Sequence, residues 1–108
     1  MSEPRRGDVY LVNLDPTRGR EIKKTRPCVV VSPDELNAHL STVLVAPMTT
    51  GEHPYPFRIA CRFRGRDGFV VLDRLRAVDR ARLVERLGPL PAPATRKALG
   101  VLREMFAD

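Results

Sequence analysis

The chain has 108 residues, with 19 Lys and Arg against 13 Asp and Glu, a formal net charge of +6 and a pI near 10.1. A chain of this length forms one domain, so we expect a single unit over residues 1–108 that buries about 65% of its unfolded surface without disulfides or a metal. The excess of positive charge favours a polyanionic partner, either nucleic acid or an acidic protein segment.

The sequence carries no targeting or metal-binding signal. The basic N-terminus is not followed by an apolar run long enough for a signal peptide, and no stretch approaches a membrane span. Cys28 and Cys61 lie far apart, with no C-x-x-C motif and no neighbouring His, so we expect two small core residues. We therefore expect a soluble, cytoplasmic protein that binds no membrane, no metal and no other cofactor.

Short apolar stretches predict a series of strands. Each stretch is rich in β-branched residues or alternates in polarity, and turn-forming residues separate them. We expect strands over residues 9–14, 28–31, 42–48, 57–61, 69–72, 75–78 and 83–87, with turns at residues 65–68 and 79–82. Pro47 must lie near an edge or an end of its strand, because proline cannot donate a ladder hydrogen bond.

Two helices are also expected. Ser32 is the predicted N-cap of a helix of one or two turns, with Pro33 at its first position and Glu35 at its third. A second helix is expected over residues 93–106. Its apolar stripe at three- and four-residue spacing should pack on the sheet; the stripe consists of Ala98, Leu99, Val101, Leu102, Met105 and Phe106. Many short strands and one closing helix predict a mainly β fold, a small, strongly bent antiparallel barrel with a C-terminal α-helix.

A long, charged loop separates the first two strands, over residues 15–25. Such loops on a rigid scaffold commonly carry binding or catalytic groups, and one this charged is not there for packing. Its single acid between Arg18 and Arg26 is Glu21. The basic residues of this stretch either grip backbone phosphates or form a solvated face; they are Arg18, Arg20, Lys23, Lys24 and Arg26.

Arg26 and Thr49 are predicted to meet at one end of the sheet. Pro27 pushes Arg26 towards extended geometry, so its guanidinium projects as a fixed donor fork for a phosphate. The third strand ends in Thr49 and Thr50, whose hydroxyls suit a phosphate oxygen. If the second and third strands pair antiparallel, Arg26 faces Thr49, with Glu21 in the loop above.

Purely structural roles are the alternative for each of these residues. The threonines terminate a strand in any case, and Glu21 is able to neutralise a neighbouring basic residue. His39 and His53 have no metal-ligand spacing and fit ordinary surface positions, although His53 lies only four residues from Thr49. A further basic set alternates beyond residue 61, and we expect ordinary exposed charge there, the alternative being a wider groove; the set is Arg62, Arg64 and Arg66.

Six segments, in order and at compatible spacings, resemble the MazF/PemK toxins of bacterial toxin–antitoxin pairs, which are ribosome-independent endoribonucleases. The segments are residues 6–10, 14–21, 26–33, 45–50, 55–57 and 66–68. The resemblance implies an SH3-like (plasmid-toxin) barrel with a C-terminal helix. It places the active-site arginine and threonine of the family on Arg26 and Thr49, and the loop glutamate on Glu21.

The resemblance further implies sequence-specific, metal-independent cleavage of single-stranded RNA. The 2′-hydroxyl of the substrate attacks the adjacent phosphorus, which leaves a 2′,3′-cyclic phosphate and a 5′-hydroxyl. Arg26 then stabilises charge and donates a proton, since an arginine pKa above ~12 makes a poor base. Thr49 orients a phosphate oxygen, and Glu21 is the candidate base. Further RNA contacts are expected from Arg18, Arg20, Lys23, Lys24, Thr50, His53 and Arg74.

The implied partners are a second copy of the chain, single-stranded RNA and an acidic antitoxin whose tail lies across the RNA groove. Arg74 follows Asp73 where relatives commonly have glutamine after the acid, so the cleaved RNA sequence is not predicted. Two other functions stay open, a CcdB-like gyrase poison without enzymatic activity and a catalytically silent RNA-binding module. The joint presence of Arg26 and Thr49 favours the ribonuclease.

Overall fold

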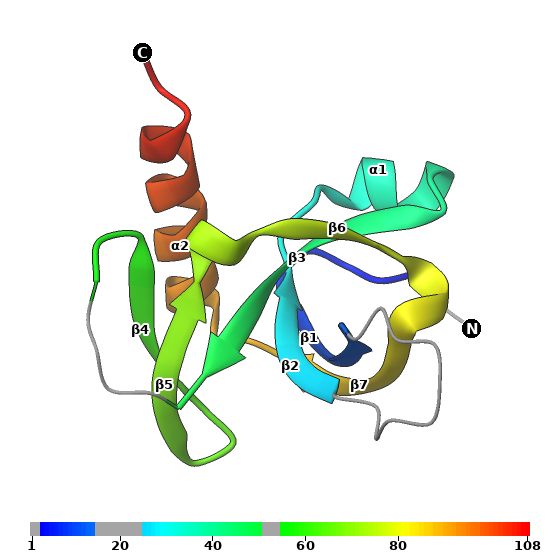
Figure 1. Cartoon of the computed structure of the whole chain (residues 1–108), viewed down its shortest axis with the longest axis horizontal. Helices are drawn as coiled ribbons and strands as arrows, with labels where there is room; N and C mark the ends of the chain where they lie inside the picture. The colour runs from blue at the N-terminus through cyan, green and yellow to red at the C-terminus, as the bar shows by residue number, and fades with distance from the viewer. Residues whose placement is uncertain (1–2, 15–24, 51–54) are drawn as a thin grey trace.

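The computed structural model describes residues 3–14, 25–50 and 55–108 (Figure 1). Each of the seven predicted strands overlaps an observed one: β1 (Asp8–Asn13), β2 (Thr25–Val30), β3 (Thr42–Thr49), β4 (Arg58–Phe63), β5 (Arg66–Val71), β6 (Arg76–Asp79) and β7 (Leu83–Pro89). The helices are α1 (Asp34–His39) and α2 (Ala92–Met105), with short 3-10 turns η1 (Leu72–Arg74) and η2 (Arg80–Arg82). The predicted mainly β fold with a C-terminal helix is confirmed. Neither α-helix has the length and apolar character to span a bilayer.

The strands form one antiparallel sheet that curls into a half-barrel. Its order is β4-β5-β3-β2-β1-β7, and β6 pairs with β3 outside this path. β3 changes partner along its length, because residues 42–47 pair with β6 and β2 whereas Met48 and Thr49 pair with β5. Pro47 lies in the last pair between β3 and β2, next to this change of partner. Curling brings the β4–β5 turn close to β7, where the Arg64 guanidinium in the turn donates a hydrogen bond to the Leu87 carbonyl at 2.5 Å.

Two apolar clusters pack on opposite faces of β2. Val29 belongs to the cluster that α2 covers, whereas Cys28 and Val30 belong to the other. Because side chains alternate along a strand, burial of both faces explains why the second half of this strand, Cys28 to Val30, is continuously apolar. Ala98 is buried in the first cluster, and Val101, Leu102 and Met105 pack against it, which confirms the predicted helical stripe for these four residues. The prediction that Phe106 belongs to this stripe is wrong. Phe106 follows the end of α2, and its side chain is 72% exposed.

The start of α1 differs from the prediction. Pro33 occupies the N-cap position, and Ser32 is not the cap. The buried Ser32 hydroxyl instead donates to the Asn37 side-chain oxygen at 2.5 Å and accepts from the Leu44 backbone N–H at 3.0 Å. The Asn37 amide nitrogen donates back to the Ser32 carbonyl at 3.0 Å. Ser32 therefore satisfies buried polar groups that join α1 to β3, which outweighs its capping preference.

Replacing Ser32 with Ala is expected to lower the free energy of unfolding by about 1–3 kcal/mol, because the Leu44 N–H and the Asn37 oxygen lose a buried partner. Thermal denaturation measures the change. Ser41→Ala is the matched control, since Ser41 is exposed. Equal melting temperatures for the two variants would show that the Ser32 network contributes nothing to stability.

The β4–β5 connection also differs from the prediction. The turn consists of Arg64 and Gly65, with φ of 52° and 78°, and Phe63 pairs with Arg66 across it. Two positive φ angles give the two-residue hairpin turn that matches the twist of paired strands. The predicted turn at residues 65–68 is therefore wrong, because residues 66–68 belong to β5. Phe57, with φ of 66°, likewise precedes β4 instead of opening it.

Asp8 anchors the N-terminal segment. It is only 6% exposed, and one carboxylate oxygen accepts from the Arg86 guanidinium at 2.8 Å while the other accepts from the Arg5 backbone N–H at 3.3 Å. Gly7 next to it has φ of +94°, donates to the Val30 carbonyl and accepts from the Leu90 N–H, each at 2.8 Å. This segment therefore stabilises the barrel end at β1 and β7.

Candidate functional site

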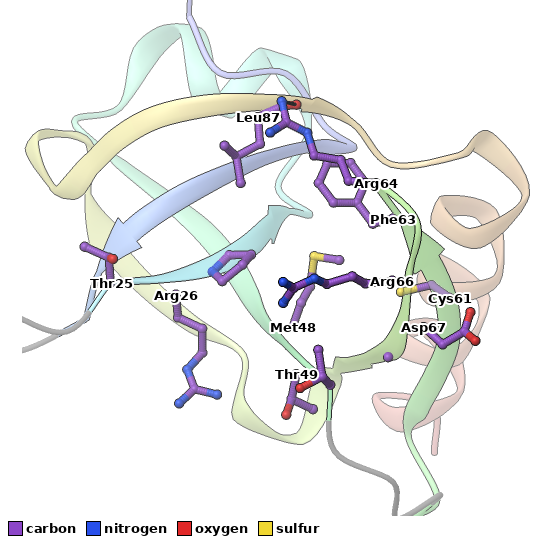
Figure 2. A pocket seen from close by; sticks show the side chains of 13 residues that line it. Thr25, Arg26, Met48, Thr49, Cys61, Phe63, Arg64, Arg66, Asp67 and Leu87 are labelled. Carbon is purple, nitrogen blue, oxygen red and sulfur yellow. Dashed lines mark hydrogen bonds between the residues drawn. The ribbon is translucent and has the colours of Figure 1, made fainter.

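A pocket of about 430 Å³ lies where β2 begins and β3 ends, facing the β4–β5 hairpin (Figure 2). Its volume is in the range of roughly 300–1,000 Å³ that is usual for small-ligand sites. The lining residues come from four segments: Thr25 to Pro27, Met48 to Thr50, the hairpin residues Cys61, Phe63, Arg64, Arg66, Asp67 and Gly68, and Leu87 of β7.

Arg26 and Thr49 share this pocket, as the sequence predicted. β2 and β3 pair antiparallel, with Cys28 opposite Pro47, which confirms the predicted pairing. Arg26, two residues before Cys28, and Thr49, two residues after Pro47, therefore lie at the same end of the sheet. Arg26 is exposed, and no residue that the structure describes forms a hydrogen bond or an ion pair with its guanidinium. As far as the described residues are concerned, the Arg26 guanidinium is available to an anion.

The pocket combines an apolar wall with cationic groups. Met48, Phe63 and Leu87 contribute apolar surface, and Figure 2 shows the Arg66 side chain reaching into the space between the walls. Cys61 also lines this space, but burial raises the pKa of its thiol, so the sulfur is protonated near neutral pH. Burial also raises the pKa of the core thiol of Cys28, to about 12. Neither thiol is suited to act as a nucleophile.

Gly68 allows β5 to lie against the backbone of Thr49. A Cβ atom added at residue 68 would lie 2.1 Å from the Thr49 carbonyl oxygen and 3.1 Å from its carbonyl carbon. Thr49 itself pairs with Phe69 across the two strands. Only glycine fits this approach without a backbone shift, so Gly68 constrains where the Thr49 backbone lies beside the pocket. From its sequence position, Gly68 was expected in the turn at residues 65–68, and no local pattern indicates its close approach to Thr49.

The hairpin arginines divide between the two faces of the hairpin. Arg62 forms an exposed ion pair with Asp67 at 2.9 Å and does not line the pocket, as expected for ordinary surface charge. Arg64 and Arg66 do line the pocket, which agrees with the alternative that these arginines widen the groove. The Arg64 guanidinium lies 5.8 Å from the Phe63 ring centroid and bonds to Leu87. The alternation of these arginines was visible in the sequence, but it did not separate the two alternatives.

Of the other predicted site residues, Thr50 lines the pocket and is exposed. Arg74 is exposed in η1 and is not part of the pocket lining. The loop residues and the second histidine lie outside the described residues, so their roles stay predictions; they are Arg18, Arg20, Glu21, Lys23, Lys24 and His53.

A polar cluster fixes η1 beside the hairpin. The Arg58 guanidinium donates to both Asp73 carboxylate oxygens, at 3.2 and 3.3 Å, and lies 4.8 Å from the Tyr55 ring centroid. The hydrogen bond from Arg58 lowers the pKa of Asp73. The Leu72 N–H donates to the Phe57 carbonyl at 3.2 Å. Asp73 is thus held by Arg58, and Arg74 follows it at a fixed position.

A curled antiparallel half-barrel with a C-terminal helix and a basic pocket at paired strand ends defines a small β-barrel domain suited to a polyanion. The family described as "PemK-like, MazF-like toxin of type II toxin-antitoxin system" matches residues 5–106, and the chain belongs to this family. The resemblance found in the sequence is confirmed, and with it the predicted barrel fold.

Relatives and solved structures agree with this assignment. The chain is 35% identical over 89 residues to "Endoribonuclease MazF" of Staphylococcus epidermidis, covering 77% of this chain and 74% of that protein. It is 36% identical over 75 residues to "Endoribonuclease toxin MazF" of Escherichia coli K12, covering 69% and 68%. The MazF crystal structure from Deinococcus radiodurans superposes with a TM-score of 0.80 at 29% identity over 97% of each chain. A MazE-MazF structure from the same organism gives 0.80 at 26% identity, covering 99% and 98%.

Proposed function

We propose that this chain is an endoribonuclease toxin that cleaves single-stranded RNA by attack of the substrate 2′-hydroxyl. The observation that carries the proposal is the convergence of Arg26 and Thr49 on one pocket, in a family whose relatives include proteins named endoribonuclease MazF. An exposed guanidinium without a protein partner among the described residues, beside a threonine hydroxyl, is suited to a phosphate.

The proposed reaction balances without a metal or a protein nucleophile. The 2′-oxygen bonds to phosphorus while the bond to the 5′-oxygen breaks, which leaves a cyclic phosphate and a 5′-hydroxyl. Arg26 stabilises the negative charge of the phosphorane and supplies the proton to the leaving 5′-oxygen. Thr49 orients a phosphate oxygen, and Glu21 accepts the proton of the 2′-hydroxyl. Cleavage at one short sequence follows from base contacts around this centre.

Further RNA contacts are assigned to residues around the pocket. Thr50 stands next to Thr49, and the basic loop enters β2 immediately before Arg26. Each basic side chain that neutralises a phosphate makes binding weaker as salt rises. The proposed contacts are Arg18, Arg20, Lys23, Lys24, Thr50, His53 and Arg74.

The proposed partners follow from charge and from the relatives. A net charge of +6 suits an acidic, partly disordered antitoxin segment as well as RNA. One of the solved structures similar to this chain is a MazE-MazF structure from Deinococcus radiodurans. On that basis we assign a MazE-like antitoxin to this chain. We also assign a homodimer, with the RNA groove near the junction of the two subunits.

Incubation of the purified protein with a long single-stranded RNA in EDTA tests the proposal. The expected result is a set of discrete fragments that end in a cyclic phosphate and begin with a 5′-hydroxyl, all cut at one short sequence. Intact RNA would contradict the proposal. Intact but bound RNA would then indicate a silent RNA-binding module, and inhibition of gyrase without RNA binding would indicate a CcdB-like poison.

A further inference from the structure

The inward face of the β4–β5 hairpin carries a cation that the proposed reaction does not use. Cys61 pairs with Gly68 and Phe63 pairs with Arg66, so these four residues lie on the face that lines the pocket. Arg66 is exposed and has no hydrogen bond or ion pair with any residue in the described ranges. Its neighbour Asp67 does not neutralise it, because Asp67 pairs with Arg62 on the outer face.

Two guanidiniums that form no hydrogen bond or ion pair with any described residue therefore share one pocket. Arg26 approaches from β2 and Arg66 from β5, on opposite walls (Figure 2). Like charges near a partly apolar wall repel one another unless an anion lies between them. The described lining residues include one acid, Asp67, which is already paired. The described lining is thus suited to more negative charge than a single phosphodiester group brings.

The position of Arg66 is fixed relative to Thr49. The tip of the hairpin is held by the bond from Arg64 to Leu87, and its base by the close approach of Gly68 to the Thr49 carbonyl. Arg66 lies two residues from Gly68 on the same face of β5. A shift of the RNA backbone along the pocket would therefore change its distances to Arg66 and to Thr49 together.

We propose that Arg66 is a positioning residue that binds the phosphate next to the one held by Arg26 and Thr49. It sets the register of the RNA chain across the pocket while the reaction occurs at the neighbouring phosphate. This inference rests on the proposed ribonuclease function. A single-stranded polynucleotide fits because it presents phosphates in series, whereas a free mononucleotide brings only one such group.

The test compares Arg66→Gln with Arg62→Gln, which removes the same charge from the outer face of the same hairpin. Steady-state cleavage of a short RNA with one site gives kcat and KM, and binding is measured with the same RNA carrying a 2′-deoxy group at the cleaved position. For Arg66→Gln we expect a rise in KM and Kd of roughly 10- to 100-fold with kcat within about threefold, as for loss of one charged hydrogen bond. The salt slope of binding should fall by about 0.7, and Arg66→Lys should restore that slope.

Several results would overturn the assignment. Unchanged Kd and KM in Arg66→Gln would remove Arg66 from the site, and an equal effect of Arg62→Gln would make the charge nonspecific. A fall in kcat at constant KM would place Arg66 on the reacting phosphate. If the wild-type protein cleaves no RNA, the proposed function fails, yet binding of the 2′-deoxy RNA still tests the phosphate contact. Melting temperatures verify that each variant is folded.

Discussion

Replacement of Arg26 by Ala is expected to lower the rate of RNA cleavage by at least roughly 100- to 1,000-fold, the usual effect of removing one well-placed donor to a developing oxyanion. Arg26 is exposed, and its guanidinium forms no hydrogen bond or ion pair with a described residue. The melting temperature should therefore stay within roughly 4 °C of the wild type, because surface substitutions of this kind change the free energy of unfolding by about 0.5 kcal/mol or less. Cleavage of a labelled RNA with a single site measures the rate.

The matched control is Arg96→Ala. Arg96 is exposed on α2, outside the pocket, and its removal lowers the net charge by the same amount. The control should cleave RNA at close to the wild-type rate. Wild-type cleavage by Arg26→Ala would remove the arginine from the mechanism, and equal losses in both variants would reduce its role to overall charge.

Gly68→Ala is expected to reduce cleavage by about 100-fold, the effect of moving a catalytic group by about 1 Å. The added Cβ meets the Thr49 backbone at 2.1 Å, where no side chain can rotate away, so β3 or β5 must shift. Overpacking of this kind also lowers the free energy of unfolding by about 1–3 kcal/mol. Cleavage rate and thermal denaturation together measure the two effects.

Gly100→Ala is the control for the same chemical change. Gly100 lies within α2, and a Cβ there meets only the end of the Arg103 side chain, at 3.9 Å. Alanine is favoured over glycine in a helix interior, so this variant should gain about 1 kcal/mol of stability and keep its activity. If Gly68→Ala cleaves like Gly100→Ala, the close approach of β5 does not position Thr49.

Local patterns in the sequence predicted the strands and the long helix, because burial imposes period two on strands and three to four on helices. The predictions failed where tertiary contacts or an unusual backbone angle, and not the local pattern, determine the structure. Ser32 is not the N-cap because its hydroxyl forms hydrogen bonds with Asn37 and Leu44. Arg64 adopted a positive φ that non-glycine residues rarely take, and this shifted the predicted hairpin turn.

Half of the site followed from one pairing rule. Antiparallel pairing of two neighbouring strands was enough to bring Arg26 and Thr49 together. The other wall required the curl of the sheet, which brings the β4–β5 hairpin against β7 and so places Arg66 and Leu87 on the same pocket. No local pattern encodes that curvature. The role of Glu21 stays a prediction from the sequence, because it lies outside the described residues.

In the proposed mechanism, the RNA supplies its own nucleophile in a pocket to which Arg26 and Thr49 contribute. The most direct measurement uses two RNAs with one cleavage site each, identical except for a 2′-deoxy group on the nucleotide before the scissile phosphate, incubated with the protein in EDTA. We predict that the all-ribose RNA is cut to a cyclic phosphate and a 5′-hydroxyl, while the deoxy RNA binds and stays intact. Cleavage of the deoxy RNA at the same phosphate would contradict this mechanism.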